Sequence, residues 1–443
     1  MEAKSKVKEI NLFPYVEKIG REFDAYKNSL EKELKKLEQL IHKFNPSLEY
    51  KEQRKSVENM FKIQGKINNL KLRLEEIKQE IQMAEKTEEE IEKENQQRQN
   101  TFNGMTAREW TLHSRNVWND VSSPRKDYHK EHGAVFPLKL AERLIKMYSR
   151  EGDLIFDPFS GIGTTIKAAL EMNRNGVGIE LNPSFYELTK RILLDPKETP
   201  IIDSCIFSEE NNGFTIQKNN ANDLFSLDGI PSNNYIKLFN DDCRNLTNYL
   251  EADSVQVLIT SPPYADFIRK SIEDREKVHK TSLIKLNNNS TVKPYSDSHL
   301  DLGNLPYDEF LEALLPIMED TYKVIKPGGY AIWVVKDYKD KENFTSYLDF
   351  HTDIANLGKK AGFLYHDLII WDQNEQRSLV LLGYPSKFHT NQNCSFLVVL
   401  RKPTTDEMKQ IRKKEKRGIE HPNDRHQSNT KSQNIRRGIL KHN

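Results

Sequence analysis

The stretch IFDPFSGIGTTIKAAL (residues 155–170) decides the fold that we expect. Its first residues are apolar and typical of a buried strand, Gly161 and Gly163 follow in a turn, and the remainder has helical spacing. Glycine in this turn lets the backbone approach a ligand closely and adopt dihedrals that other residues avoid. The segment GVGIEL (residues 176–181) supplies the next short strand. The order strand, glycine turn, helix, strand predicts a βαβ unit within a mixed α/β core.

A carboxylate at the end of the first strand restricts the class of ligand that this turn can bind. Asp157 would repel a phosphate and attract a cation. The turn also lacks the third glycine of a dinucleotide site, because Ile166 stands there, and no Gly-Lys-Ser/Thr follows as in a phosphate loop. S-adenosylmethionine, a nucleoside with an amino acid and a sulfonium, fits these demands better than a phosphate-rich cofactor.

Two further acids follow the next expected strands. Glu180 ends the strand at residues 176–181, where a carboxylate accepts hydrogen bonds from ribose hydroxyls in dinucleotide-binding domains. Asp242 follows the strand at residues 235–240 and could accept from an adenine amino group. Each acid alone could be a cap or a surface charge. Three acids at successive strand ends predict one cofactor site.

The stretch VLITSPPYADF (residues 257–267) predicts a second functional element. Its apolar strand ends at Ser261, and the prolines that follow fix a non-helical loop. Ser261 and the carbonyl of Pro262 can accept the two N–H bonds of an exocyclic amine, and Tyr264 can stack on a flat base. The alternative is a proline-rich turn with a surface tyrosine. Methylation of a ring carbon is disfavoured, because such chemistry usually needs a cysteine nucleophile, and no cysteine follows a proline among Cys205, Cys243 and Cys394.

These motifs resemble those of the amino-methylating DNA methyltransferases, the N4-cytosine and N6-adenine family. The resemblance covers roughly residues 131–403. The matching segments are DPFSGIGTT (157–165), GIEL (178–181), SPPY (261–264), HGAVFPLKLAERLI (132–145), KPGGYAIWVV (326–335) and NCSFLVVLRK (393–402).

The resemblance implies a fold and a set of site residues. The fold is a Rossmann-like α/β sheet of S-adenosylmethionine-dependent methyltransferases with a C-terminal antiparallel hairpin. The implied catalytic residues are Ser261, Pro262, Pro263 and Tyr264. The implied cofactor-binding residues are Phe136, Asp157, Phe159, Gly161, Gly163, Thr164, Glu180 and Asp242.

The substrate expected from the resemblance is duplex DNA with a flipped target base. Family members reading SPPY mostly methylate N4 of cytosine, so Ser261 favours cytosine over adenine N6. The chain departs from the family at residues 132–137, which read HGAVFP where the family usually has HPAPFP. Residues 185–236 look like an insertion, and we assign no role to it. In this chain the cofactor motif, DPFSGIGTT, precedes the catalytic motif, SPPY, whereas many N4-cytosine enzymes have the two motifs in the reverse order.

Target recognition is expected outside the catalytic core. Residues 265–305 form an apparent insert beside the catalytic loop, and residues 337–393 are a second candidate. Basic side chains in the first insert could track a phosphate backbone; they are Arg269, Lys270, Arg275, Lys277 and Lys280. The alternative is a solvated loop.

Outside the body, we expect an N-terminal arm and a C-terminal tail. Residues 1–100 have apolar residues at alternating steps of four and three, which predict a helical hairpin or a coiled-coil arm. The arm would mediate homodimer or partner-subunit contacts, or simply pack on the body as a charged helix pair. Residues 101–403 are the expected methyltransferase domain, and residues 404–443 a basic disordered tail.

Composition excludes several classes of protein. The net charge of +1 gives no global basic surface, so basic character must be local. The three scattered cysteines argue against a disulfide framework and against a metal site. No apolar run is long enough to span a membrane, and the charged first ten residues do not resemble a secretory signal, so we expect a cytoplasmic protein.

The expected function is site-specific DNA methylation at cytosine N4, within a restriction–modification or phage system. Methylation of adenine N6 is the nearest alternative. The same acceptor geometry would also suit an RNA amine, although no RNA-binding module is evident. A third alternative is an assembly protein that keeps an inactive methylase body. The recognition sequence, the oligomeric state and any cognate endonuclease are not predicted.

Overall fold

The computed structural model describes residues 13–44, 50–84, 88–122, 126, 128–129, 135–210, 212–218, 234–266, 298–338, 347–374, 390, 392–416 and 423. The chain divides into two compact units. One unit comprises Met1–Asn100 and Asp372–Asn393, and the other comprises Thr101–Trp371 and Cys394–Asn443. Among the described residues, no helix is both long enough and apolar enough to cross a membrane.

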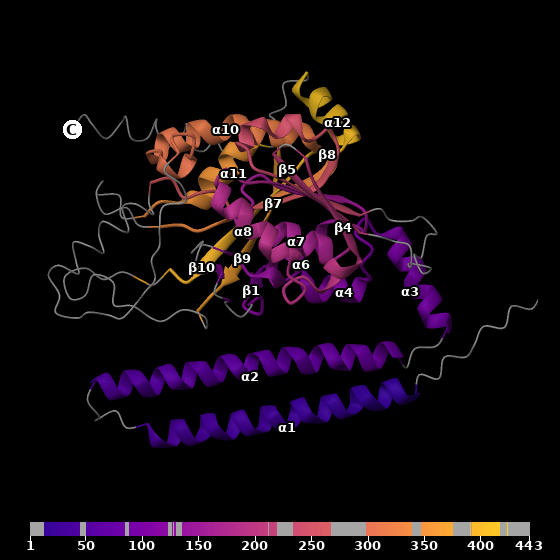
Figure 1. Cartoon of the computed structure of the whole chain (residues 1–443), viewed down its shortest axis with the longest axis vertical. Coiled ribbons are helices and arrows are strands. Elements are labelled where there is room, and N and C mark those ends of the chain that lie inside the picture. Colours follow the sequence, from indigo (N-terminus) through magenta and orange to yellow (C-terminus); the bar gives the residue numbers. More distant parts are fainter. Residues whose placement is uncertain are drawn as a thin grey trace, which may run out of the picture. The chain divides into compact units, whose positions relative to one another are not determined.

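The first unit is built from the helices α1 (Phe13–Lys43), α2 (Tyr50–Ala84) and α3 (Glu88–Asn100). α1 and α2 lie side by side (Figure 1). Arg73 of α2 donates to Glu22 of α1 at 3.0 Å. On the predicted apolar seam of α2, Ile67, Leu74 and Ile77 are buried. Leu34 and Ile41 on the α1 seam are 38% and 57% exposed, and a dimeric coiled coil stays a prediction.

The second unit contains a mixed sheet of ten strands in the order β1-β9-β10-β8-β7-β2-β3-β6-β5-β4. The strands are β1 (Val117–Trp118), β2 (Leu154–Asp157), β3 (Asn175–Ile179), β4 (Cys205–Glu210), β5 (Gly213–Lys218), β6 (Tyr235–Phe239), β7 (Val255–Thr260), β8 (Ile325–Val335), β9 (Leu364–Asp372) and β10 (Cys394–Arg401). The central strands β8, β7, β2, β3 and β6 are parallel. The predicted βαβ unit is confirmed as β2, α7 (Thr164–Glu171) and β3.

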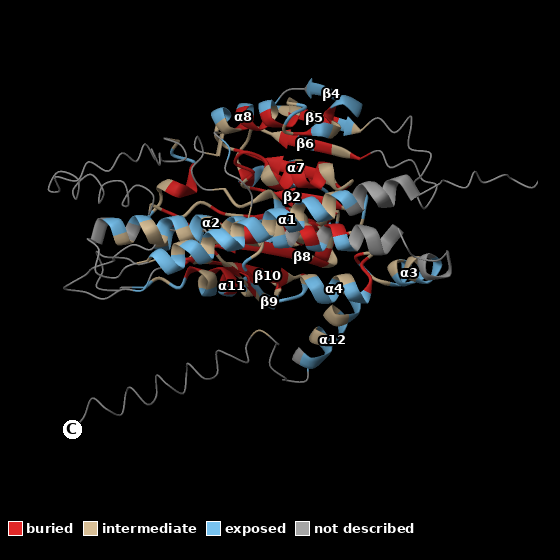
Figure 2. Cartoon of the chain, turned by 90° about the horizontal axis from the view of Figure 1, so that it is seen from below, coloured by how far each residue is buried: buried red, intermediate tan, exposed pale blue. Residues whose placement is uncertain are grey.

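Helices cover both faces of this sheet, because neighbouring residues of each central strand enter opposite cores. Ile155 of β2 packs in one hydrophobic cluster and Phe156 in the other. The first cluster receives side chains from α6 (Leu138–Tyr148), α7 and α8 (Pro183–Leu194), and the second from α10 (Tyr307–Val324) and α11 (Phe350–Lys360). Figure 2 shows the buried residues concentrated in the strands. Such fully buried parallel strands are typical of doubly covered α/β sheets.

The remaining elements are short. They are α4 (Ala107–His113), α12 (Thr405–Glu415), and the 3-10 turns η1 (Pro200–Ser204), η2 (Cys243–Asn248) and η3 (Leu302–Asn304).

The strands at the two edges of the sheet include the apparent insertion and the C-terminal strands. The apparent insertion at residues 185–236 contains α8 and the antiparallel strands β4 and β5, which extend the sheet beyond β6. On the other side, β10 runs antiparallel to β8 and neighbours β9. Residues 375–389 and 391, between β9 and β10, lie outside the described residues, so the C-terminal hairpin stays a prediction in its details.

The prediction of a disordered tail from residue 404 is wrong for its first turns. Residues Thr405–Glu415 form α12, and Thr404 caps this helix in a capping box with Glu407. Glu407 also forms an ion pair with Arg401 of β10 at 2.7 Å. These anchoring contacts outweigh the low apolar content on which the expectation of disorder rested.

Both candidate recognition segments reach into the core. In the first, Leu302 of η3 belongs to the second hydrophobic cluster. In the second, α11 and β9 are parts of the core and the sheet. Residues 267–297, 339–346 and 375–389 lie outside the described residues, and the predicted DNA contacts of Arg269, Lys270, Arg275, Lys277 and Lys280 fall there.

Candidate active site

The glycine turn joins β2 to α7 in a conformation that requires glycine. Gly161 and Gly163 have φ values of 55° and 75°, in the left-handed region. A Cβ atom at Gly163 would also come within 2.4 Å of Cγ2 of Thr189. Thr189 cannot move freely, because it is buried and its hydroxyl donates to the carbonyl of Gly161 at 3.0 Å. Local backbone and long-range packing therefore both fix this turn.

Asp157 ends β2 and is buried, with 2% of its surface exposed. Its Oδ1 accepts from the hydroxyl of Thr260 at 2.6 Å and from the backbone N–H of Phe159 at 3.1 Å. Burial raises the pKa of Asp157 to about 6, although these hydrogen bonds favour the charged form. Since Thr260 is the last residue of β7, the bond ties β2 to the strand that leads into the loop of residues 261–264.

Glu180 follows β3 and secures the glycine turn. Its carboxylate accepts from the backbone N–H groups of Gly161 at 2.7 Å and Asn182 at 2.8 Å. Burial nevertheless raises its pKa to about 8. The site thus holds two carboxyl groups that are costly to ionise, and a cationic ligand would favour their charged forms.

These residues line a pocket of about 880 Å³, counting the part that is open to solvent. Four acids face it: Asp157, Glu180, Asp242 and Asp301. None of the lining residues that the structure describes is basic. Asp242 also pairs with Arg244 at 2.5 Å, which offsets part of its charge. The pocket is therefore electrostatically suited to a ligand with positive charge.

The loop of residues 261–264, for which the sequence predicts a catalytic role, reaches the same pocket through Ser261 and Pro263. Pro262 is buried and Tyr264 is half-buried, and neither is among the lining residues. The Tyr264 ring instead contacts Phe350 edge to face, with the ring centroids 6.0 Å apart. The buried Cys243 also lines the pocket. Burial raises the pKa of its thiol, so the thiolate that a covalent mechanism needs is disfavoured.

Most of the expected site residues therefore lie together. The pocket is lined by Phe136, Asp157, Phe159, Gly161, Thr164, Glu180, Asp242, Ser261 and Pro263. Gly163, Pro262 and Tyr264 lie outside the lining.

The sequence analysis missed other lining residues, which are Val135, Pro158, Ser160, Ile162, Leu181, Asn182, Phe185, Cys243, Leu300, Asp301 and Leu302. Most of them are sequence neighbours of predicted residues. Asp301 is not a sequence neighbour of a predicted residue. The only sequence signal at this position is for a helix cap, because an Asp two residues before a glycine can accept from its N–H, as Asp301 does from Gly303 at 2.8 Å.

Comparison with known proteins shows similarity to DNA methylases over part of the chain. A model of the DNA methylase family matches residues 15–191, which include the glycine turn but end before the catalytic loop. The type II methyltransferase M.BglI of Bacillus subtilis is 34% identical over 123 residues, 28% of this chain and 34% of that protein. The type II methyltransferase M.MthZI of Methanothermobacter thermautotrophicus is 43% identical over 76 residues, 16% of this chain and 21% of that protein.

A solved S-adenosylmethionine-dependent methyltransferase from Methanosarcina mazei is 10% identical and has a TM-score of 0.32, with 59% of this chain and 97% of that chain covered. The chain spans about a third or less of the length of the two type II methyltransferases. The resemblance to the amino-methylating DNA methyltransferases is thereby confirmed, without a distinction between cytosine N4 and adenine N6.

Proposed function

We propose that this chain methylates an exocyclic amino group of a base in duplex DNA, with S-adenosylmethionine as the methyl donor. The observation that carries the proposal is the shared pocket: Ser261 of the catalytic loop lines it together with Gly161 and Glu180 of the cofactor motifs. A methyl donor and an acceptor amine must meet within one such cavity.

The residues of the pocket fit S-adenosylmethionine. Its sulfonium and ammonium groups would favour the charged forms of the lining acids, whereas a di- or triphosphate would face no basic partner among the described lining residues. The hydroxyl of Ser160 is buried without a hydrogen-bond partner among the described residues, so it can serve a ligand. Thr164 begins α7, whose N-terminus favours a carboxylate such as that of the methionine moiety.

Each acid has a distinct proposed role. Glu180 would accept from the ribose hydroxyls, and Asp242 from the adenine amino group. Asp157 would favour the cationic end of the cofactor and, through Thr260, keep the catalytic loop next to it. When bound, the cofactor supplies an electrophilic methyl group on a positively charged sulfur.

The catalytic loop would orient the amine. Ser261 and the carbonyl of Pro262 would accept its two N–H bonds, which turns the nitrogen lone pair toward the methyl group. Catalysis would then rest on positioning and electrostatics, and the proton could leave the amine after the transfer. Cys243 has no role as a nucleophile in this scheme, because its thiol is buried and its pKa is raised.

The finer proposal is N4 of cytosine at a specific site, in a restriction–modification or phage system. It is supported by serine at position 261 and by the type II methyltransferases among the relatives. Adenine N6 is the alternative, because the matched family methylates both amines. We also propose that the arm of α1 and α2 mediates assembly, which sedimentation of the full chain and of residues 101–443 would test.

The direct test is methyl transfer by the purified full chain. Duplex DNA of high sequence diversity would be incubated with S-adenosylmethionine labelled in the methyl group, digested to nucleosides and analysed by mass spectrometry. N4-methylcytosine is expected, and N6-methyladenine would correct the target base while keeping the reaction class. Labelling of structured RNA in preference to DNA would reject the proposed substrate. Normal cofactor binding without transfer to either polymer would favour an inactive methylase body.

A further inference from the structure

Tyr264 is embedded in an aromatic cluster that comes from distant parts of the chain. The aromatic cluster consists of Tyr264, Tyr307, Phe310, Tyr338 and Phe350, and Phe350 is its centre, because its ring contacts the other four. The ring centroid of Phe350 lies 6.0 Å from that of Tyr264, 6.0 Å from that of Tyr307 and 6.1 Å from that of Tyr338. Phe350 is fully buried. Its position therefore limits where the Tyr264 ring can lie.

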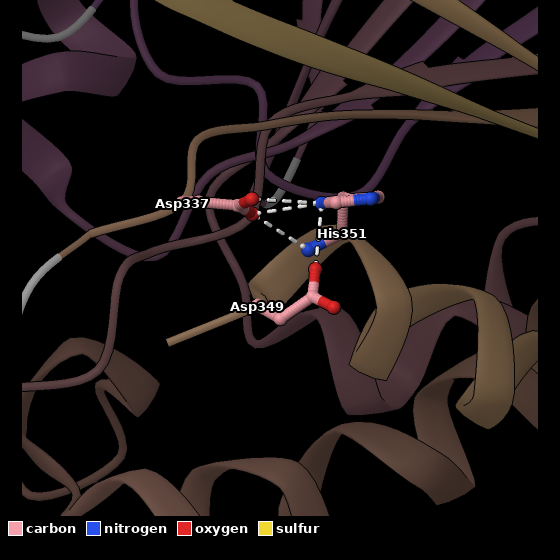
Figure 3. Close-up of side chains that lie close together, drawn as sticks. All are labelled: Asp337, Asp349 and His351. Carbon is pink, nitrogen blue, oxygen red and sulfur yellow. Dashed lines mark hydrogen bonds and ion pairs between the residues drawn. The ribbon is translucent and has the colours of Figure 1, made fainter. Parts of the chain in front are cut away.

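A buried carboxylate holds the segment that carries Phe350. Asp337 follows β8 at the same sheet edge as Ser261, and only 2% of its surface is exposed. It accepts from the backbone N–H of His351 at 3.0 Å, from Nδ1 of His351 at 2.8 Å and from the hydroxyl of Tyr347 at 2.8 Å (Figure 3). Oδ1 of Asp349 lies 2.9 Å from the same ring nitrogen. Phe350 is thus flanked by two residues that are anchored to this network.

Two further contacts hold the start of α11, which carries Phe350. The His351 ring stacks on Phe396 of β10, with centroids 4.2 Å apart and an interplanar angle of 17°. The hydroxyl of Tyr307 donates to Asp353 of α11 at 2.6 Å. The start of α11 is therefore tied to β8, β10 and α10. Side chains locked in this way by surrounding contacts are what a functional group needs to keep its geometry.

We propose that Phe350 is a positioning residue for Tyr264 in methyl transfer, and that Asp337 and His351 fix Phe350 in place. The inference rests on the proposed function, because it gives Tyr264 the task of holding the target base. It explains why a tyrosine outside the cofactor pocket has a defined place: its ring is set by α11, whereas Ser261 and Pro263 are set by β7. A displaced ring would slow the transfer and leave the cofactor site unchanged.

The same three polar side chains also lie near one another as metal ligands would. The ligand atoms of Asp337, Asp349 and His351 are within 4.8 Å of one another. The hydrogen bond from the His351 ring nitrogen to Asp337 and its ion pair with Asp349 already account for this arrangement. The positioning role and a metal site make different predictions, which allows one set of experiments to separate them.

The central experiment compares Phe350→Leu with Phe363→Leu in the full chain. Both phenylalanines are fully buried in the same hydrophobic cluster, but the Phe363 ring contacts Tyr322 and not Tyr264. Phe350→Leu is expected to lower kcat on DNA at least tenfold, with the Kd for S-adenosylmethionine within twofold of wild type. Phe363→Leu is expected to lower thermal stability to a similar extent while keeping kcat within threefold. Equal kcat losses in the two variants would overturn the inference.

The hydrogen bond to Asp337 is tested by a pair of histidine variants. His351→Asn keeps an N–H donor near the position of Nδ1, whereas His351→Leu removes it. His351→Asn is expected to retain most of the kcat, and His351→Leu to lose about tenfold. Similar activity in both would reject a role for this bond. Loss of wild-type activity in EDTA with recovery on added zinc or manganese would replace the positioning role with a metal site.

A second mutation shows whether Phe350 acts through Tyr264. In a Tyr264→Ala background, Phe350→Leu should cause no further loss in single-turnover rate, because the ring that it positions is gone. An additional tenfold loss would contradict the inference. If the wild-type chain itself transfers no methyl group to DNA, the proposed function has failed; a working wild type with unchanged Phe350→Leu kinetics refutes the positioning role alone.

Discussion

The proposed cofactor side of the site, around the glycine turn and its acids, and the proposed catalytic side, at Tyr264, are held in different ways. On the cofactor side, the key contacts join residues close to the glycine turn, such as Glu180 and the backbone N–H of Gly161. On the catalytic side, the Tyr264 ring packs against Phe350, which is far from it in sequence. The contacts of the glycine turn thus lie mostly within the parallel sheet and its neighbouring helices, whereas the Tyr264 ring packs against the helical layer of α10 and α11. Damage to the first should affect cofactor binding, and damage to the second the transfer step.

The largest expected effect is on the cofactor side, at Gly163. Gly163→Ala should destabilise the fold by about 3 kcal/mol, because the positive φ and the clash with Thr189 add together. Gly152→Ala is the matched control: its φ is 78°, but nothing lies within 4 Å of the new Cβ, so it should cost about 1 kcal/mol. Urea unfolding of both variants measures the difference. Equal losses would mean that packing around Thr189 does not constrain the turn.

The next effect separates the two sides most clearly. Tyr264→Ala should lower kcat about 100-fold, because stacking on a base is worth about 1–3 kcal/mol and the oriented amine is lost as well. The Kd for S-adenosylmethionine, measured by calorimetry, should be nearly unchanged, since Tyr264 does not line the pocket. Tyr264→Phe keeps the ring and should retain most of the activity. A cofactor affinity that falls together with kcat would show that the two sides are not independent.

A smaller effect concerns pH and the two buried acids. The pKa values of these acids, about 6 for Asp157 and about 8 for Glu180, lie above the ordinary values. The stabilisation contributed by the protonated forms is therefore present at low pH and is lost as the pH rises through about 6 and about 8. A cationic cofactor prefers the ionised forms, so its affinity should increase about tenfold between pH 6 and pH 8.

Calorimetry with S-adenosylmethionine across this range tests the effect. Glu180→Gln cannot ionise and should flatten the part of the profile that is due to Glu180. A wild-type affinity that is constant from pH 6 to pH 8 would contradict the assignment of the acids to the cofactor.

The contrast between the two sides also explains what the sequence could predict. The glycine turn, Asp157 and Glu180 were predictable, because the strand–turn–helix pattern places them at one sheet edge without knowledge of distant contacts. The packing of Tyr264 on Phe350 was not, since it depends on how α11 folds back onto the loop. Asp301 was hidden for a related reason: it lies in a segment interpreted as a recognition insert, and only the tertiary fold brings it to the pocket. The strands β4 and β5 lacked a functional motif, although their antiparallel pairing extends the sheet.

The smallest expected effect is at Asp242, the third acid of the cofactor side. Unlike Glu180, Asp242 forms an ion pair with a partly exposed Arg244 and accepts from the backbone N–H of the same residue at 2.9 Å. Its charge is already offset, so Asp242→Asn should weaken S-adenosylmethionine only about two- to threefold, in the range of a single screened interaction.

A substitution of Arg244, the ion-pair partner of Asp242, should change the cofactor affinity in the opposite direction. Arg244→Gln frees the Asp242 carboxylate and should strengthen binding of the cationic cofactor slightly, as measured by calorimetry at neutral pH. If Asp242→Asn instead abolished binding of S-adenosylmethionine, the hydrogen bond from the adenine amino group to Asp242 would matter more than the screened charge. Asp242 would then contribute more to cofactor binding than the other acids of the cofactor side. Because neither variant touches the aromatic cluster, any change in kcat at saturating cofactor would show that the local motif also acts on the transfer step.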